Sequence, residues 1–165
     1  IQKVNNTITV NDQQGTEGVD SLSNIERLQF SDVNIAFDTG STESAGMTAR
    51  LLTTAFGQNT LTNKAVAGIG ITLFDNGSTF EQVSQLAINT GVISAPTNVD
   101  FVSAIWLNVV GSPIDSNSLQ FYTQALDNNE ITQVSLLVAA SQTGLISSII
   151  QSVGINETGL DYVIG

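Results

Sequence analysis

Carboxylates are the side chains with the widest chemical scope in this sequence, which contains no histidine and no cysteine. Histidine is the usual general base, and both missing residues are the main ligands of zinc, copper and iron. A Ser-His-Asp triad is therefore excluded. Two acid pairs, Asp12 with Glu17 and Asp20 with Glu26, have the residue types of a glycosidase but lie on a turn-rich hairpin with no evident cleft. We expect no enzymatic activity, and an enzyme that uses carboxylates alone is kept as an alternative.

Oxygen side chains offer weak candidates for calcium ligands. Asp115 and Asn117 alternate with serines before an apolar run, but the glycine that a full calcium loop requires at its sixth position is missing. The simpler interpretation is that this segment caps a helix, with a side-chain oxygen accepting a free amide hydrogen. Asp12 and Asp20 complete the set of candidate metal ligands, and we expect no required cofactor.

The charge balance excludes several partners. The chain has 4 Lys and Arg against 15 Asp and Glu, a formal net charge of -11, and its basic residues are Lys3, Arg27, Arg50 and Lys64. Nucleic acids and anionic membrane surfaces need basic side chains, so neither is an expected partner. No stretch reaches the roughly 18 apolar residues of a membrane span, which predicts no membrane insertion.

The elements that position these residues fall into two regions. Of the 165 residues, 41% are hydrophobic, which suits one folded domain. Residues 1–40 read as short strands, because apolar and polar residues alternate between turn signals. Residues 41–48 are rich in Ser, Thr and Gly and are interpreted as a linker. Helical spacing follows, over 49–154, so the predicted fold class is α+β.

An internal repeat organises the helical part. Residues 49–94 and 103–147 share short matching segments in the same order, and Leu73 to Gly77 corresponds to Ala125 to Asn129 at an offset of 52. Each copy reads as helix, glycine stop, helix, Asp-Asn turn, helix. Two helical units that each expose an apolar stripe bury the stripes most simply against each other. A helical bundle of two similar units is therefore expected.

Aromatic residues are the candidates for a binding surface. Trp106 is expected at the edge of the second unit, and Tyr122 among its core residues. An adhesion or surface-layer module would use such residues to bind sugar, protein or a neighbouring copy of itself.

One segment resembles a known family. Residues 15–32 include Gly18-Val19-Asp20-Ser21-Leu22 and Ile25-Glu26-Arg27-Leu28-Gln29-Phe30, and they resemble a segment at the end of calcium-binding RTX-type β-roll regions in bacterial proteins of type I secretion. The glycine-aspartate nonapeptide that holds calcium in that family is absent. The resemblance implies a secreted or cell-surface protein with further domains upstream, and the absence of an initiator Met at Ile1 agrees with a fragment.

The second helical copy resembles the domain of unknown function numbered 4214, which is common in the same secreted proteins. The pattern runs from Phe101 through Gly111 and continues at Pro113, Asp115 and Leu119, although Ser112 stands where the family usually has Arg. This resemblance implies a helical, non-enzymatic module and names no ligand.

Residues 155–165 form the expected tail. Asp161, Tyr162, Val163 and Ile164 are an acid followed by apolar residues, which looks like the uncleaved signal that type I exporters read. A last strand or a frayed end is the alternative. The expected function is a non-catalytic export and structural region whose partners are the type I secretion machinery and the upstream domains.

Overall fold

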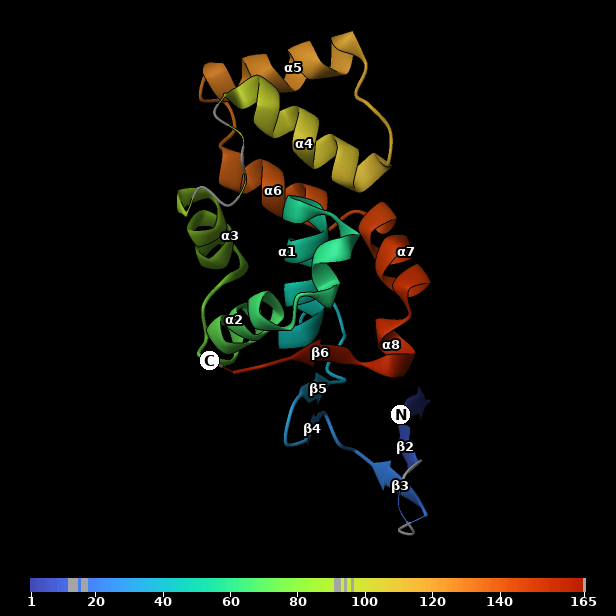
Figure 1. Ribbon diagram of the computed structural model, residues 1–165. Helices are drawn as coiled ribbons and strands as arrows, with labels where there is room; N and C mark the ends of the chain where they lie inside the picture. The colour runs from blue at the N-terminus through green and yellow to red at the C-terminus, as the bar shows by residue number, and fades with distance from the viewer. Residues whose placement is uncertain (12–14, 16–17, 91–92, 94, 96, 165) are drawn as a thin grey trace.

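The computed structural model describes residues 1–11, 15, 18–90, 93, 95 and 97–164. Two small antiparallel sheets precede a helical domain, so the predicted α+β class is confirmed (Figure 1). The strands are β1 (Gln2–Val4), β2 (Thr7–Asn11), β3 (Val19–Ser23), β4 (Arg27–Gln29), β5 (Asn34–Ala36) and β6 (Leu160–Tyr162).

The two sheets differ in how they are built. The first has the order β1-β2-β3 and consists of consecutive strands, with Lys3, Ile8 and Leu22 side by side. The second has the order β4-β5-β6, so its third strand comes from the other end of the chain. Figure 1 shows this second sheet between the first sheet and the helices. A small cluster of Ile8, Ile35 and Phe37 joins the two sheets.

The helices form two units of similar length and spacing. Helices α1 and α4 both have 13 residues, and α2 and α5 both have 12. The helices are α1 (Ser44–Phe56), α2 (Lys64–Asp75), α3 (Phe80–Asn89), α4 (Asn98–Val110), α5 (Ser116–Asp127), α6 (Gln133–Ser141), α7 (Gly144–Val153) and α8 (Ile155–Thr158), with a 3-10 helix η1 (Gln58–Thr62) after α1. The units meet through α1 against α4 and α3 against α6.

The expected linker 41–48 is wrong in its second half, because α1 already begins at Ser44. Asp38 explains the early start, since its carboxylate accepts a hydrogen bond from the amide of Ala45 at 3.2 Å. Gly46 fits there because a Cβ at this position would lie 1.9 Å from the carbonyl oxygen of Gly40. The Ser- and Gly-rich composition therefore marks a tightly packed helix start rather than a loose joint.

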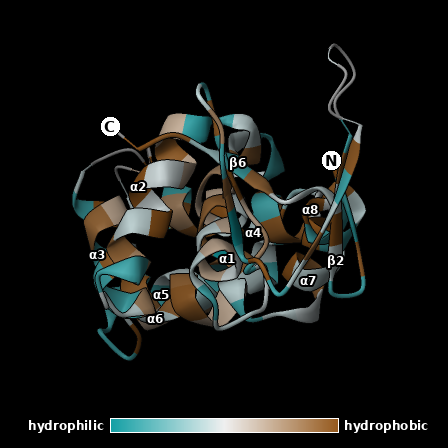
Figure 2. Cartoon of the chain, turned by 90° about the horizontal axis from the view of Figure 1, so that it is seen from below, coloured by the Kyte–Doolittle hydropathy of each residue, from teal (hydrophilic) through white to brown (hydrophobic). Residues whose placement is uncertain are grey.

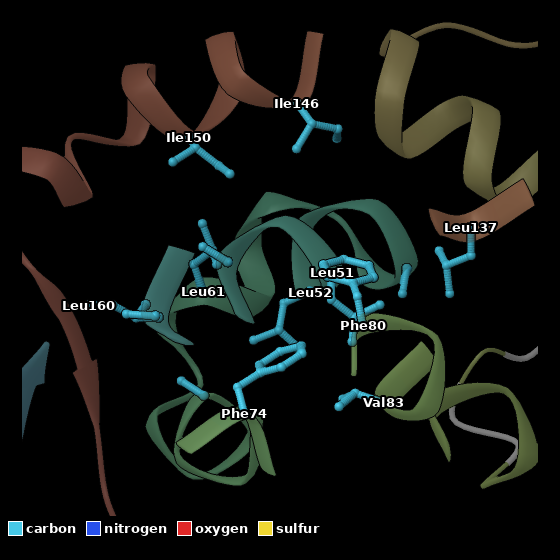
Figure 3. Close-up of a cluster of buried hydrophobic side chains, with 14 of the residues drawn as sticks. Leu51, Leu52, Leu61, Phe74, Phe80, Val83, Leu137, Ile146, Ile150 and Leu160 are labelled. Atoms are coloured by element: carbon cyan, nitrogen blue, oxygen red, sulfur yellow. The ribbon is translucent and has the colours of Figure 1, made fainter. Parts of the chain in front are cut away.

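Helix α1 is the centre of the helical domain. Figure 2, seen from below, shows it surrounded by the other helices. Leu51 and Leu52 meet Phe74, Phe80 and Val83 from α2 and α3 (Figure 3). The rings of Phe74 and Phe80 are 5.8 Å apart between centroids. In the second unit Phe101, Ile105, Val109, Leu126 and Leu137 are buried, whereas Leu119, Val134, Val138 and Tyr122, which was expected in the core, are only partly buried.

Polar caps begin most of these helices. Asp115 accepts hydrogen bonds from the amides of Asn117 and Ser118, both at 3.0 Å, which confirms the helix-cap interpretation. Thr79 and Thr132 each form a capping box. The Asp-Asn turns end α2 and α5, as the sequence predicts.

Candidate functional site: the C-terminal clasp

The candidate export tail is folded into the second sheet. Strand β6 pairs antiparallel with β5, with Asp161 opposite Ile35 and Tyr162 opposite Asn34. Helix α8 occupies the first part of the expected tail. The expected boundary at residue 155 coincides with the end of α7 at Val153, and the residues after it form α8 and the strand β6, which is the alternative of a last strand. We call β6 and its contacts with β5, α2 and Arg27 the C-terminal clasp.

The four candidate signal residues have different surroundings. Tyr162 is 6% exposed, and Asp161 pairs with the ammonium group of Lys64 at 2.9 Å. The amide of Val163 donates to the carbonyl oxygen of Lys64 at 3.0 Å. Ile164 is 65% exposed. Three of the four residues are thus held by the folded domain.

Gly68 allows the tail to approach α2 closely. A Cβ at this position would lie 1.9 Å from the carbonyl oxygen of Val163, far inside van der Waals contact. Gly68 lies in the interior of α2, where glycine costs about 1 kcal/mol relative to alanine. Gly68 therefore lowers the stability of α2 itself but allows the tail to contact this helix.

Arg27 connects the tail to three other parts of the chain. Its guanidinium donates to both oxygens of Asp38 at 2.6 Å, and to Asp75 at the end of α2 at 3.2 Å. It also donates to the hydroxyl of Tyr162 at 3.5 Å and lies 5.6 Å from the centre of that ring. These four residues, Arg27, Asp38, Asp75 and Tyr162, are called the Arg27 cluster. The cluster joins β4, the start of the helical domain, α2 and β6.

The positive charge of Arg27 is stabilised by its neighbours although the side chain is partly buried. Burial lowers the pKa of Arg27, but hydrogen bonds with Asp38 and Tyr162 and the negative charge of Asp38 outweigh this effect. The net result is a pKa raised above the ordinary arginine value. The bidentate geometry with Asp38 is the strong form of an arginine–carboxylate pair.

The candidate calcium ligands are not brought together. Asp20 is exposed on β3, Asp115 is the cap of α5, Asn117 lies in the first turn of that helix, and Asp12 lies outside the described residues. Within the described ranges, no group of three or more His, Cys, Asp or Glu could hold a metal ion. The pKa of Asp115 is lowered, chiefly by hydrogen bonds from the side chain and amide of Ser118. Its carboxylate is used by the helix.

The candidate binding aromatics do lie together. The rings of Trp106 and Tyr122 are 6.3 Å apart, and Phe121 stands edge-on to Tyr122 at 5.2 Å. Trp106 is partly buried, as expected for a residue at the edge of the core, whereas Tyr122, expected in the core, is also only partly buried and Phe121 is 67% exposed. Sequence reasoning missed Phe121.

Sequence reasoning also missed the residues that hold the clasp. The sequence singles out Lys64 only as one of four basic residues, and Arg27 only as another of these and as part of the RTX-like segment. A lone arginine in a strand of an acidic chain is nevertheless a signal that a carboxylate lies nearby. Gly68 lies within a helical run, and a glycine in that position is a signal of a close backbone contact.

Comparisons add no relative. A scan of family models and searches of curated proteins and of solved structures find no match to this chain.

The apolar helices were also compared with the length of a membrane span. Over the described part of the chain, no single helix is long and apolar enough to cross a membrane. Helices α6 and α7 pass such a test only as a pair, and they are bent by 58° at their junction.

Proposed function

We propose that this chain is a non-catalytic C-terminal export and structural region of a larger secreted or cell-surface bacterial protein. A type I secretion system would recognise its tail, Asp161 to Ile164. The observation that carries the proposal is the contact of Arg27 with Tyr162. Arg27 belongs to the RTX-like segment and Tyr162 to the signal-like tail, so two features that separately suggest type I secretion are parts of one structural unit.

The clasp also fits the order of events that export requires. An exporter reads and threads an unfolded chain, whereas Tyr162 is buried and Asp161 is paired once the domain has folded. The tail would therefore be readable before folding and covered afterwards. A chain without cysteine forms no disulfide that would hinder threading, and its acidic surface keeps the exported product soluble.

Export of an inert passenger tests the proposal. Residues 1–165 are fused to the passenger in cells with the cognate type I exporter, and the fraction in the medium is compared with that of a fusion without residues 156–165. Because the truncation also removes β6, a third fusion carries Arg27→Met, which weakens the clasp but keeps the tail sequence. We expect export of the full-length and Arg27→Met fusions only. Export of the truncated fusion, or of none, would contradict the proposal.

A second candidate is an adhesion or surface-layer module. The observation that favours it is Phe121, which is 67% exposed beside Tyr122 and Trp106. A Phe121→Ser variant that is exported normally but no longer retains the passenger on the cell surface would support this candidate. Unchanged surface retention would count against it.

A further inference from the structure

Each helical unit contains an apolar groove between its three helices. The first groove, of about 190 Å³, is lined by α1, α2 and α3. The second groove, of about 330 Å³, is lined by α4, α5, α6 and the start of α7. Neither lining includes a charged side chain. The main lining residues are Leu52, Phe56, Ile69, Leu73 and Leu86 in the first groove and Trp106, Val110, Tyr122, Leu136 and Leu145 in the second.

The two grooves are built at equivalent positions. Helix α4 begins 54 residues after α1 begins, and α5 begins 52 residues after α2 begins. With the third helices aligned at an offset of 53, the lining residues of α1 and α3, together with Thr90, all have counterparts in the second groove, whereas on α2 only Gly70 does. The corresponding pairs include Thr48 with Val102, Leu52 with Trp106, Phe56 with Val110, Gly70 with Tyr122, Val83 with Leu136, and Thr90 with Thr143. The groove is therefore a property of the repeated unit rather than of one poorly packed side chain.

Large apolar side chains at both grooves face solvent. Ile69 is 60% exposed and Leu86 is 45% exposed at the first groove. Val110 is 41% exposed and Leu145 is 52% exposed at the second. An apolar groove with exposed apolar residues along it has the composition of a site that another chain covers.

Charge identifies the kind of partner. Each of the four basic side chains has a partner within the chain. Arg27 and Lys64 bind carboxylates, Lys3 donates to Phe37 O, and Arg50 donates to Ser141 O and Ser147 Oγ. No Lys or Arg follows Lys64 in the sequence. The second unit, residues 98–147, carries four exposed carboxylates, Asp100, Asp115, Asp127 and Glu130, and no basic side chain. A second copy, also of net charge -11, would be repelled there, whereas a basic partner would be attracted.

We propose that each groove binds the apolar face of an amphipathic helix that carries Lys or Arg on its outer face. The groove size suits one or two apolar side chains of such a helix, and helices laid into apolar grooves contact them through residues at i, i+3, i+4 and i+7. The second groove binds more tightly, because its helices carry exposed acids and no base. This inference goes beyond export and does not depend on it.

A synthetic peptide provides the probe. It has about 14 residues, with Leu at helical spacing and Lys elsewhere, and the control is a peptide of the same composition in scrambled order. Calorimetric titration of the full chain is expected to give two peptides per chain. Trp106, the only tryptophan, reports on the second groove through its fluorescence. Raising salt from about 0.05 to about 0.5 M is expected to weaken binding, most at the second groove.

Matched variants assign the sites. Leu86→Asn and Leu145→Asn each remove one exposed apolar side chain without a change of charge, and each is expected to weaken one site about tenfold. Leu145→Asn is expected to shift the Trp106 fluorescence response to about tenfold higher peptide concentration, whereas Leu86→Asn leaves it unchanged. Val99→Asn is the control, because Val99 is 45% exposed on α4 but does not line the groove.

Four results would overturn the proposal. The first is no peptide binding at millimolar concentration, and the second is equal binding of the scrambled peptide. The third is a peptide affinity that neither groove variant changes. The fourth is a wild-type dimer that Leu86→Asn or Leu145→Asn converts to a monomer, which would show that a second copy covers the grooves.

Discussion

Replacement of Gly68 by alanine tests the clasp most directly. In the interior of a helix this change ordinarily stabilises a protein by about 1 kcal/mol, because alanine loses less backbone entropy on folding. Here the added Cβ would lie 1.9 Å from the carbonyl oxygen of Val163, so the tail must move by more than 1 Å to restore an ordinary contact. We therefore expect Gly68→Ala to destabilise the protein, whereas the same change within most helices stabilises it.

The magnitude follows from what the tail would lose. A strained but attached tail costs about 1–3 kcal/mol, as overpacked cores do. Full detachment would expose Leu160 and Tyr162, which are 1% and 6% exposed in the folded chain, and would cost about 4 kcal/mol. After the helix gain of about 1 kcal/mol is subtracted, we expect Gly68→Ala to lower the free energy of unfolding by about 1–3 kcal/mol.

Urea unfolding, followed by Trp106 fluorescence and far-ultraviolet circular dichroism, measures this loss. With a slope of about 2 kcal/mol per molar urea, the midpoint is expected to fall by about 0.5–1.5 M. Gly144→Ala is the matched control, because a Cβ at Gly144 meets nothing within 4 Å, and its midpoint should stay the same or rise slightly. A midpoint for Gly68→Ala that equals or exceeds that of the wild type would refute the close contact between α2 and the tail.

Three further predictions concern single side chains. Arg27→Met is expected to lower the free energy of unfolding by about 2–4 kcal/mol, because it leaves the buried Asp38 carboxylate without its positive partner. Lys64→Met, which breaks an exposed ion pair, should cost less than about 1 kcal/mol. A double-mutant cycle of Arg27→Met with Asp38→Asn measures the coupling of the two side chains, and additive effects would contradict the coupling. Thr48→Val is expected to stabilise the protein by about 1 kcal/mol in the same urea assay, because within the described residues Thr48 Oγ1 is buried without a hydrogen-bond partner. The control, Thr54→Val, removes a hydrogen bond to Arg50 O and should give no such gain. Asp115→Ala is expected to lower the melting temperature at neutral pH. The folded protein lowers the pKa of Asp115 from its ordinary 3.8, so the stability that the carboxylate contributes is present above pH 3.8 and is lost as the pH falls through the folded pKa. The melting temperatures of the wild type and the variant should therefore converge in acid, and a difference that persists there would contradict the cap.

The parts of the fold that the sequence predicted are those with local causes. The repeat, the Asp-Asn turns and the Asp115 cap depend on residues within a few positions of one another. The start of α1 was misplaced because Asp38 acts across the Ser- and Gly-rich segment. The place of the tail could not be predicted, since β6 carries no distinctive periodicity in three residues and its partner β5 lies near the other end of the chain.

The candidate site was predicted in part for the same reason. Trp106 and Tyr122 were chosen by residue type and do lie together, but Phe121 was overlooked because exposure of one helix face depends on how α5 packs on α4. The lining of the grooves depends on three helices at once, and no single helix reveals it.

The pairing of β5 with β6 has a consequence for how the chain folds. Residues 35 and 161 must meet before the second sheet is complete, so a loop that contains the whole helical domain has to close. Loop closure of this length is entropically unfavourable and slow unless the intervening helices have already packed and brought the ends together. The helical units are therefore expected to form first and the second sheet last, so that the pairing of β6 with β5, rather than the packing of the helices, sets the moment at which the molecule becomes fully native.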